Sequence, residues 1–157
     1  MSDAATVISR LAAASQTLVL AESCTAGLVA DLLAQVPGAS QVFWGAYVSY
    51  TVAAKIAMLG VDEGIIRRYG AVSRETACAM AQGALQRSGA DIAVAVTGLA
   101  GPEGDGTPVP VGTLWIATVL RGREEQAKVF HYTGSRQEVR SAAARAVIQE
   151  LICRLSL

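Results

Sequence analysis

The sequence predicts a single α/β domain over residues 1–157, with helices on both faces of a mixed, largely parallel sheet. Three observations favour this three-layer α/β/α fold class. Short apolar runs alternate with stretches of helical periodicity along most of the chain, which is typical of α/β folds. Two strand-like segments follow one another near the C-terminal end, as in a hairpin, so part of the sheet should be antiparallel. No linker or internal repeat divides the chain.

In the first part of the chain, apolar residues at helical spacing indicate the helices, and apolar or β-branched runs indicate the strands. The second of these helices should end at the Pro-Gly step at 37–38. In order, we expect a helix over 4–11, a strand over 17–21, a helix over 28–36, a strand over 41–50, and helices over 53–59 and 63–69.

In the rest of the chain, capping residues mark the helices. Ser73 should cap a long helix, and Ser135 with Glu138 should form a capping box for the last one. The loop over 98–110 is rich in glycine and proline and exceeds ordinary connection lengths, and such loops are often functional. The expected strands cover 91–96, 114–120 and 126–132, and the last helix runs to about residue 154.

Composition excludes several classes of protein. Apolar residues make up 52% of the chain, which excludes a disordered protein, and 13 basic residues balance 13 acidic ones. Three widely spaced cysteines predict free thiols, and no signal peptide or membrane-spanning run is visible. We therefore expect a cytoplasmic protein that acts on a small molecule and binds neither nucleic acid nor a membrane. The high apolar content also predicts a homo-oligomer.

Lys55 is the residue best suited to act as a base. The chain has eleven arginines and two lysines, and arginine does not deprotonate in proteins. A lysine can act as a base when desolvation lowers its pKa. Lys55 lies in an apolar helical segment with no charged neighbour for several residues on either side. The alternative is a surface lysine whose aliphatic stem covers an apolar face.

Several hydroxyl groups are candidate partners for Lys55. Parallel strands deliver their carboxyl ends to one edge of the sheet, where ligands bind in α/β folds. Each hydroxyl could instead be a helix cap. The candidates that follow apolar strands or breaks are Ser23, Thr25, Ser40, Tyr50 and Thr97.

Two further residues are candidates for the nucleophile or the base. Cys24 lies at a predicted helix N-terminus, which lowers a thiol pKa, but no histidine lies near it in sequence, and the alternative is a packed small residue. His131 is the only histidine, and its place inside a predicted strand is typical of a surface or packed residue. A zinc site is not expected, because the cysteines are not clustered.

Five motifs occur in an order that resembles the C-terminal domain of the competence/damage-inducible protein CinA. The same domain also occurs alone as nicotinamide-nucleotide amidohydrolase. The resemblance covers essentially the whole chain. The motifs are Ala21–Gly27, Phe43–Tyr50 followed by Lys55, Gly70–Ser73, Val96–Pro102 and Pro110–Thr113.

The resemblance implies hydrolysis of nicotinamide mononucleotide to nicotinate mononucleotide and ammonia, in the recycling of NAD. The reaction would use a serine–lysine dyad without metal or cofactor. Lys55 would be the base, and either Ser23 or Ser40 the nucleophile. Tyr50 would orient Lys55 or pass a proton, and Thr97 would bind the carboxamide or the dyad.

The resemblance also implies two backbone sites for the substrate, one for the oxyanion and one for the phosphate. One is the turn with Glu22, Thr25, Ala26 and Gly27, and the other is the loop with Gly98, Ala100 and Gly101.

The chain departs from the family pattern at two positions. Ala26 replaces a glycine, which requires a negative φ at this position, and an asparagine is missing near Thr51-Val52, which could change specificity. The alternatives to the dyad enzyme are a non-catalytic nucleotide-binding or regulatory module with the same pocket, and an amidase that uses Cys24.

Overall fold

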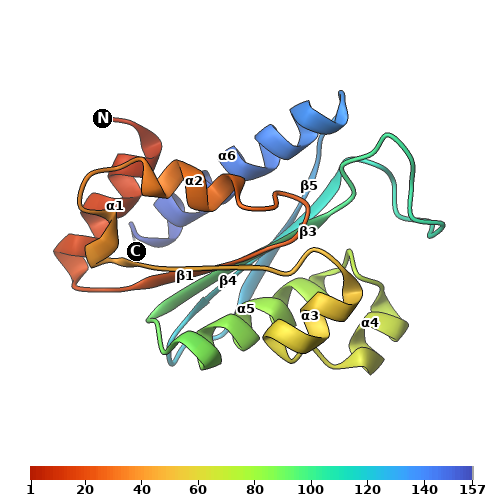
Figure 1. Ribbon diagram of the computed structural model, residues 1–157, viewed down its shortest axis with the longest axis horizontal. Helices are drawn as coiled ribbons and strands as arrows, with labels where there is room; N and C mark the ends of the chain where they lie inside the picture. Colours follow the sequence, from red (N-terminus) through yellow and green to blue (C-terminus); the bar gives the residue numbers. More distant parts are fainter. Residues whose placement is uncertain (157) are drawn as a thin grey trace.

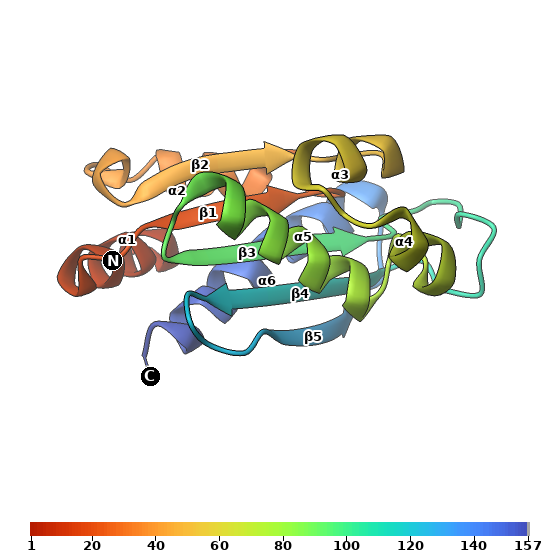
Figure 2. The same cartoon turned by 90° about the horizontal axis from the view of Figure 1, so that it is seen from below.

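Within residues 1–156, which the computed structural model describes, five strands form one mixed sheet. The strands are β1 (Leu18–Glu22), β2 (Phe43–Val48), β3 (Ile92–Gly98), β4 (Thr113–Leu120) and β5 (Gln126–His131). Their order is β2-β1-β3-β4-β5 (Figure 2). β2 and β3 run parallel to β1, whereas β4 runs antiparallel to β3 and to β5. The mixed sheet is therefore confirmed, with as many antiparallel as parallel pairs.

Helices cover both faces of this sheet and complete the predicted three layers (Figure 1). One face carries α1 (Asp3–Ala14), α2 (Leu28–Ala34) and α6 (Arg136–Arg154), and the other carries α3 (Val52–Leu59), α4 (Glu63–Tyr69) and α5 (Arg74–Ser88). Among the described residues, none of these helices has the length and hydrophobicity needed to cross a bilayer.

The central strands are buried on both faces because their side chains alternate between the two helical layers. In β1, Leu18 and Leu20 pack against the layer of α1, α2 and α6, while Val19 and Ala21 pack against the layer of α5. This explains why β1 appears in the sequence as an uninterrupted apolar run.

The element boundaries agree with the sequence prediction to within a few residues. The expected strand over 41–50 is shorter, because a 3-10 turn (η1, Ala39–Gln41) precedes β2 and the chain leaves the sheet after Val48. β3 and β4 extend further than expected, so the long loop occupies 99–112 and projects beyond the sheet in both views (Figures 1 and 2).

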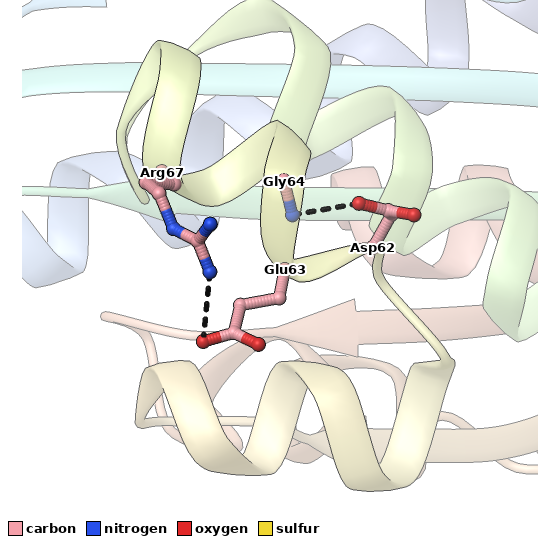
Figure 3. Close-up of polar contacts among 4 residues, drawn as sticks. All are labelled: Asp62, Glu63, Gly64 and Arg67. Atoms are coloured by element: carbon pink, nitrogen blue, oxygen red, sulfur yellow. Dashed lines mark hydrogen bonds and ion pairs between the residues drawn. The ribbon is translucent and has the colours of Figure 1, made fainter.

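Helix caps fix where the helices begin. Ser73 caps α5, and the capping box of Ser135 and Glu138 is present, as predicted. A further carboxylate cap starts α4, where Asp62 accepts a hydrogen bond from the Gly64 backbone N–H at 2.6 Å (Figure 3). The nearby ion pair of Glu63 and Arg67, at 3.4 Å, is largely exposed and therefore contributes little stability.

Close packing of two helices fixes the position of α3, which carries Lys55. A Cβ atom at Gly83 in α5 would lie 2.0 Å from the carbonyl oxygen of Leu59 in α3. Only glycine allows this approach, so Gly83 sets the distance between the two helices.

Candidate active site

Lys55 and Ser23 meet at the carboxyl end of β1. The Nζ atom of Lys55 lies 2.8 Å from the Ser23 hydroxyl oxygen. It also lies 3.1 Å from the carbonyl oxygen of Ser49 and 3.3 Å from that of Tyr50. Lys55 is only 2% exposed, so it is a buried amine and not the surface lysine that the sequence also allowed.

The parallel pairing of β1 with β2 brings these groups together. Glu22, the last residue of β1, pairs with Val48 at the end of β2, so the residues after both strands share one edge of the sheet. The chain then enters α3, whose N-cap Thr51 accepts a hydrogen bond from the Ala54 N–H at 3.0 Å. Lys55 lies one turn into α3 and reaches back toward the strand ends.

Burial changes the acid–base behaviour of Lys55. Desolvation lowers the pKa of its amine from 10.5 to about 8. Within residues 1–156, no carboxylate oxygen lies within 4.0 Å of Nζ to oppose this shift. A neutral amine has two N–H groups and one lone pair. The carbonyls of Ser49 and Tyr50 can accept the two N–H groups, which leaves the lone pair for the Ser23 hydroxyl.

Ser40 lies elsewhere. It belongs to η1, before β2 begins, and its side chain is exposed. The whole of β2 separates it from Ser49 and Tyr50 at the other end of that strand. The structure therefore brings Ser23 to Lys55 and leaves Ser40 at the opposite end of β2.

Glu22 is buried and its carboxylate points into the N-terminus of α2. One carboxylate oxygen accepts hydrogen bonds from the Thr25 hydroxyl at 2.6 Å, the Gly27 N–H at 2.9 Å and the Val29 N–H at 3.3 Å. The other accepts from the Ala30 N–H at 2.9 Å. Of the N–H groups in this turn that were expected to bind a substrate anion, that of Gly27 is thus already occupied by an anion of the protein, and that of Ala26 donates to the Ser23 carbonyl at 3.0 Å.

The backbone at Ala26 contradicts the sequence expectation. Its φ is +48°, in the left-handed region, and not negative as the alanine suggested. Gly27 follows with a φ of +98°. The turn forms with an alanine at a cost of about 1 kcal/mol, so the missing glycine strains this turn but does not open it.

A cavity of 170 Å³ opens beside Ser23. Three of the residues that line it, Cys24, Ala100 and Gly101, have backbone N–H groups without a hydrogen-bond partner within residues 1–156. A larger cavity of 390 Å³ lies between α1, α2 and α6, but no group of the Lys55 site borders it. We place the candidate site at the smaller cavity, whose lining residues are Ser23, Cys24, Tyr50, Gly98, Leu99, Ala100, Gly101, Glu103 and Arg136.

Two arginines of α6 that were not predicted from the sequence also belong to this site. Arg136 donates to the Gly101 carbonyl at 2.6 Å and to the Tyr50 hydroxyl. Arg140 donates to the backbone carbonyls of Cys24 at 2.9 Å and Thr25 at 3.1 Å. Arg136 is the first residue of α6, where a cation is unfavourable for the helix dipole. That cost could have indicated a role for Arg136 in the sequence.

Comparisons with known proteins show the family of this chain. The profile of the CinA C-terminal domain matches residues 2–155. This chain belongs to the CinA C-terminal domain family. A CinA-like protein of Akkermansia muciniphila is 47% identical over 146 residues, which are 93% of this chain and 35% of that protein. A CinA-like protein of Geobacter metallireducens is 45% identical, with 88% and 33% covered. The chain therefore spans about a third of the curated relatives it matches.

Solved structures of the CinA superfamily share the whole fold. The competence/damage-inducible protein CihA from Agrobacterium tumefaciens is 39% identical, with a TM-score of 0.90 over 100% of this chain and 98% of that one. A CinA superfamily protein from Klebsiella pneumoniae is 32% identical, with a TM-score of 0.94 over 98% and 96%.

Three other candidate residues of this CinA domain, within its described part, make no side-chain hydrogen bond to Lys55 or Ser23. The hydroxyl of Thr97 donates to the Ala71 carbonyl at 2.8 Å and so holds the segment before α5. Burial raises the pKa of the Cys24 thiol to about 11, so the expected lowering at a helix N-terminus is outweighed and the thiol stays protonated at neutral pH. His131 lies across the β4–β5 pair from Thr113, with Nδ1 3.3 Å from its hydroxyl oxygen.

Proposed function

We propose that this chain hydrolyses the carboxamide of nicotinamide mononucleotide to nicotinate mononucleotide and ammonia. The observation that carries the proposal is the 2.8 Å contact between the buried Lys55 amine and the Ser23 hydroxyl. A serine that borders a cavity can act as a nucleophile when a neighbouring lysine with a lowered pKa serves as its base. We place the reaction in the cytoplasm, as the spacing of the cysteines suggests.

The first half-reaction forms an acyl-enzyme. Neutral Lys55 takes the proton of the Ser23 hydroxyl, and the Ser23 oxygen attacks the carboxamide carbon. The tetrahedral intermediate collapses as the Lys55 ammonium returns the proton to the leaving nitrogen, and ammonia departs. In the second half-reaction, Lys55 takes a proton from water, the hydroxide attacks the ester, and Ser23 leaves with the proton. Lys55 is neutral again at the end.

Backbone N–H groups of the cavity can stabilise the developing oxyanion. The N–H of Cys24 follows directly after the nucleophile, and those of Ala100 and Gly101 belong to residues after β3 that line the same cavity. All three lack a partner within the described residues, so they can donate to the oxyanion without breaking an existing hydrogen bond.

The charges at the cavity suit a nucleotide with a cationic pyridinium ring and an anionic phosphate. Arg136 donates only to neutral acceptors, the Gly101 carbonyl and the Tyr50 hydroxyl, so its charge is available for a phosphate. Glu103 also borders the cavity and can face the cationic ring. Tyr50 links the dyad to the arginine proposed to bind the phosphate, because its carbonyl contacts Lys55 while its hydroxyl contacts Arg136.

The test is an ammonia assay with purified protein and three pyridine carboxamides: nicotinamide mononucleotide, nicotinamide riboside and nicotinamide. We expect ammonia and nicotinate mononucleotide from the mononucleotide at the highest kcat/KM. Thermal stabilisation by the mononucleotide without any product would contradict the proposal and would indicate a non-catalytic binding module.

A further inference from the structure

We propose that Glu22 is a positioning residue for the catalytic serine, and that it holds the Ser23 turn in place without touching the substrate. This inference rests on the function proposed above, because it assigns a role at the same site. The family resemblance implies that Glu22 belongs to a substrate-binding turn. Its carboxylate, however, does not border the cavity beside Ser23.

The side chain of Glu22 closes the turn that carries Ser23. Its four acceptor contacts go to Thr25, Gly27, Val29 and Ala30, so they span the turn and the first turn of α2. Ser23 stands between Glu22 and this set of donors. The carboxylate therefore fixes both ends of the short segment whose middle bears the nucleophile.

The backbone of Glu22 is tied to the Lys55 half of the dyad. Its carbonyl oxygen accepts from the Ser49 N–H at 2.8 Å and from the Ser49 hydroxyl at 3.3 Å. The carbonyl of the same Ser49 contacts Lys55 Nζ. Glu22 is thus joined to Ser23 along the chain and to Lys55 through the hydrogen bonds of Ser49. A shift of the Glu22 side chain would therefore misalign the 2.8 Å contact between Lys55 and Ser23.

A carboxylate is needed here for chemical reasons. All four donors are N–H or O–H groups, and Glu22 is only 1% exposed, so water does not replace a lost contact. An amide would keep one acceptor oxygen but would set its NH2 group against the Ala30 N–H. Glu22→Gln therefore removes the negative charge and the hydrogen bond from the Ala30 N–H, while it conserves the size of the side chain.

The matched control is the carboxylate cap of α4. Asp62 accepts from one N–H at the start of that helix, and its side chain is exposed and does not border the cavity (Figure 3). Asp62→Asn makes the same carboxylate-to-amide change at a helix start away from the dyad. It should change stability only.

The experiment measures Ser23 reactivity directly, as the rate at which phenylmethanesulfonyl fluoride modifies Ser23 at pH 9, read by mass spectrometry. The Ser23 oxygen bonds to sulfur, fluoride leaves, and Lys55 takes the hydroxyl proton. We expect Glu22→Gln to slow this reaction by about tenfold to about a hundredfold, and to lower kcat for ammonia release to match, with KM within about twofold. The midpoint of the pH profile should stay unchanged, because Lys55 keeps its surroundings. Asp62→Asn should react at the wild-type rate.

A milder variant keeps the test decisive if Glu22→Gln does not fold. Thr25→Val removes one of the four donors and should slow modification several-fold. Wild-type rates in folded Glu22→Gln, or in Thr25→Val, would overturn the inference. Slower modification in these variants while wild-type protein releases no ammonia would support the inference and refute the proposed function. No modification of wild-type Ser23 would refute both, because an activated serine is their common premise.

Discussion

The Nζ atom of Lys55 lies 2.8 Å from the hydroxyl oxygen of Ser23, although 32 residues separate them in the sequence. Parallel pairing of β1 with β2 puts Ser23 and the start of α3 at one edge of the sheet. Burial then makes Lys55 a base near neutral pH, because desolvation lowers the pKa of its amine to about 8. The following expected outcomes depend on this pair and on the turn around it.

The rate of ammonia release should rise with pH through the pKa of Lys55. Only the neutral amine accepts the Ser23 proton, and the amine is mostly protonated below its pKa of about 8. We expect kcat/KM, measured from about pH 6 to about pH 10, to increase roughly tenfold per pH unit on the acidic side and to level off above about pH 8. A rate that is already constant below pH 7 would contradict a lysine base.

Lys55→Met should raise stability while it abolishes activity. The folded chain has a lowered Lys55 pKa, so the unfolded chain binds more protons between about pH 8 and 10.5, and wild-type stability should rise with pH in this window. Below the window the shift corresponds to a penalty of roughly 3 kcal/mol. Methionine removes the penalty but leaves the Ser49 and Tyr50 carbonyls without a donor, so we expect a net gain of about 1–2 kcal/mol at pH 7.

Urea unfolding of wild type and Lys55→Met at pH 7 and at pH 10 measures this effect. The gain should shrink at the higher pH, where wild-type Lys55 is neutral. A variant that is less stable than wild type at pH 7 would show that the buried amine does not strain the fold.

Ala26→Gly should stabilise the domain. Ala26 has a φ of +48°, which costs an alanine about 1 kcal/mol and a glycine almost nothing. The midpoint of urea unfolding should rise with kcat unchanged. Ala12→Gly, on an exposed position of α1, is the matched control and should destabilise by about 1 kcal/mol. A loss of stability in Ala26→Gly would contradict the left-handed turn.

Arg136→Gln should weaken recognition of the phosphate. We expect KM for nicotinamide mononucleotide to rise by about tenfold with little change in kcat, and KM for nicotinamide riboside to change little. Arg145→Gln is the control, because Arg145 lies on the same helix but borders another cavity. An equal loss on both substrates would assign Arg136 to the chemistry or to the fold.

Much of the fold was predictable, because the central strands are apolar runs and the helices carry Ser73 and Ser135 as caps. Lys55 was predicted to lie beside hydroxyl groups at strand ends, because parallel strands bring their carboxyl ends to the same edge of a sheet. The same rule distinguishes Ser23, which follows β1, from Ser40, which precedes β2, once the pairing of those strands is known. Self-association, expected from composition, stays a prediction.

Other features of the site could not be predicted from local sequence. The sequence shows Glu22 next to a helix start but not that its side chain turns back onto α2. From α6, more than a hundred residues after Cys24, Arg136 reaches the cavity and Arg140 reaches the backbone of the turn after β1, so only tertiary packing brings them there. The positive φ of Ala26 opposes the preference of alanine, and the tertiary contacts of the turn outweigh that preference.

The most direct test of the dyad compares ammonia release from nicotinamide mononucleotide by wild type, Ser23→Ala and Ser40→Ala at pH 9, with folding checked by circular dichroism. We expect Ser23→Ala to lose at least about a thousandfold in kcat and Ser40→Ala to match wild type, because only Ser23 contacts Lys55. Full activity in Ser23→Ala, or its loss in Ser40→Ala, would contradict the Ser23–Lys55 dyad.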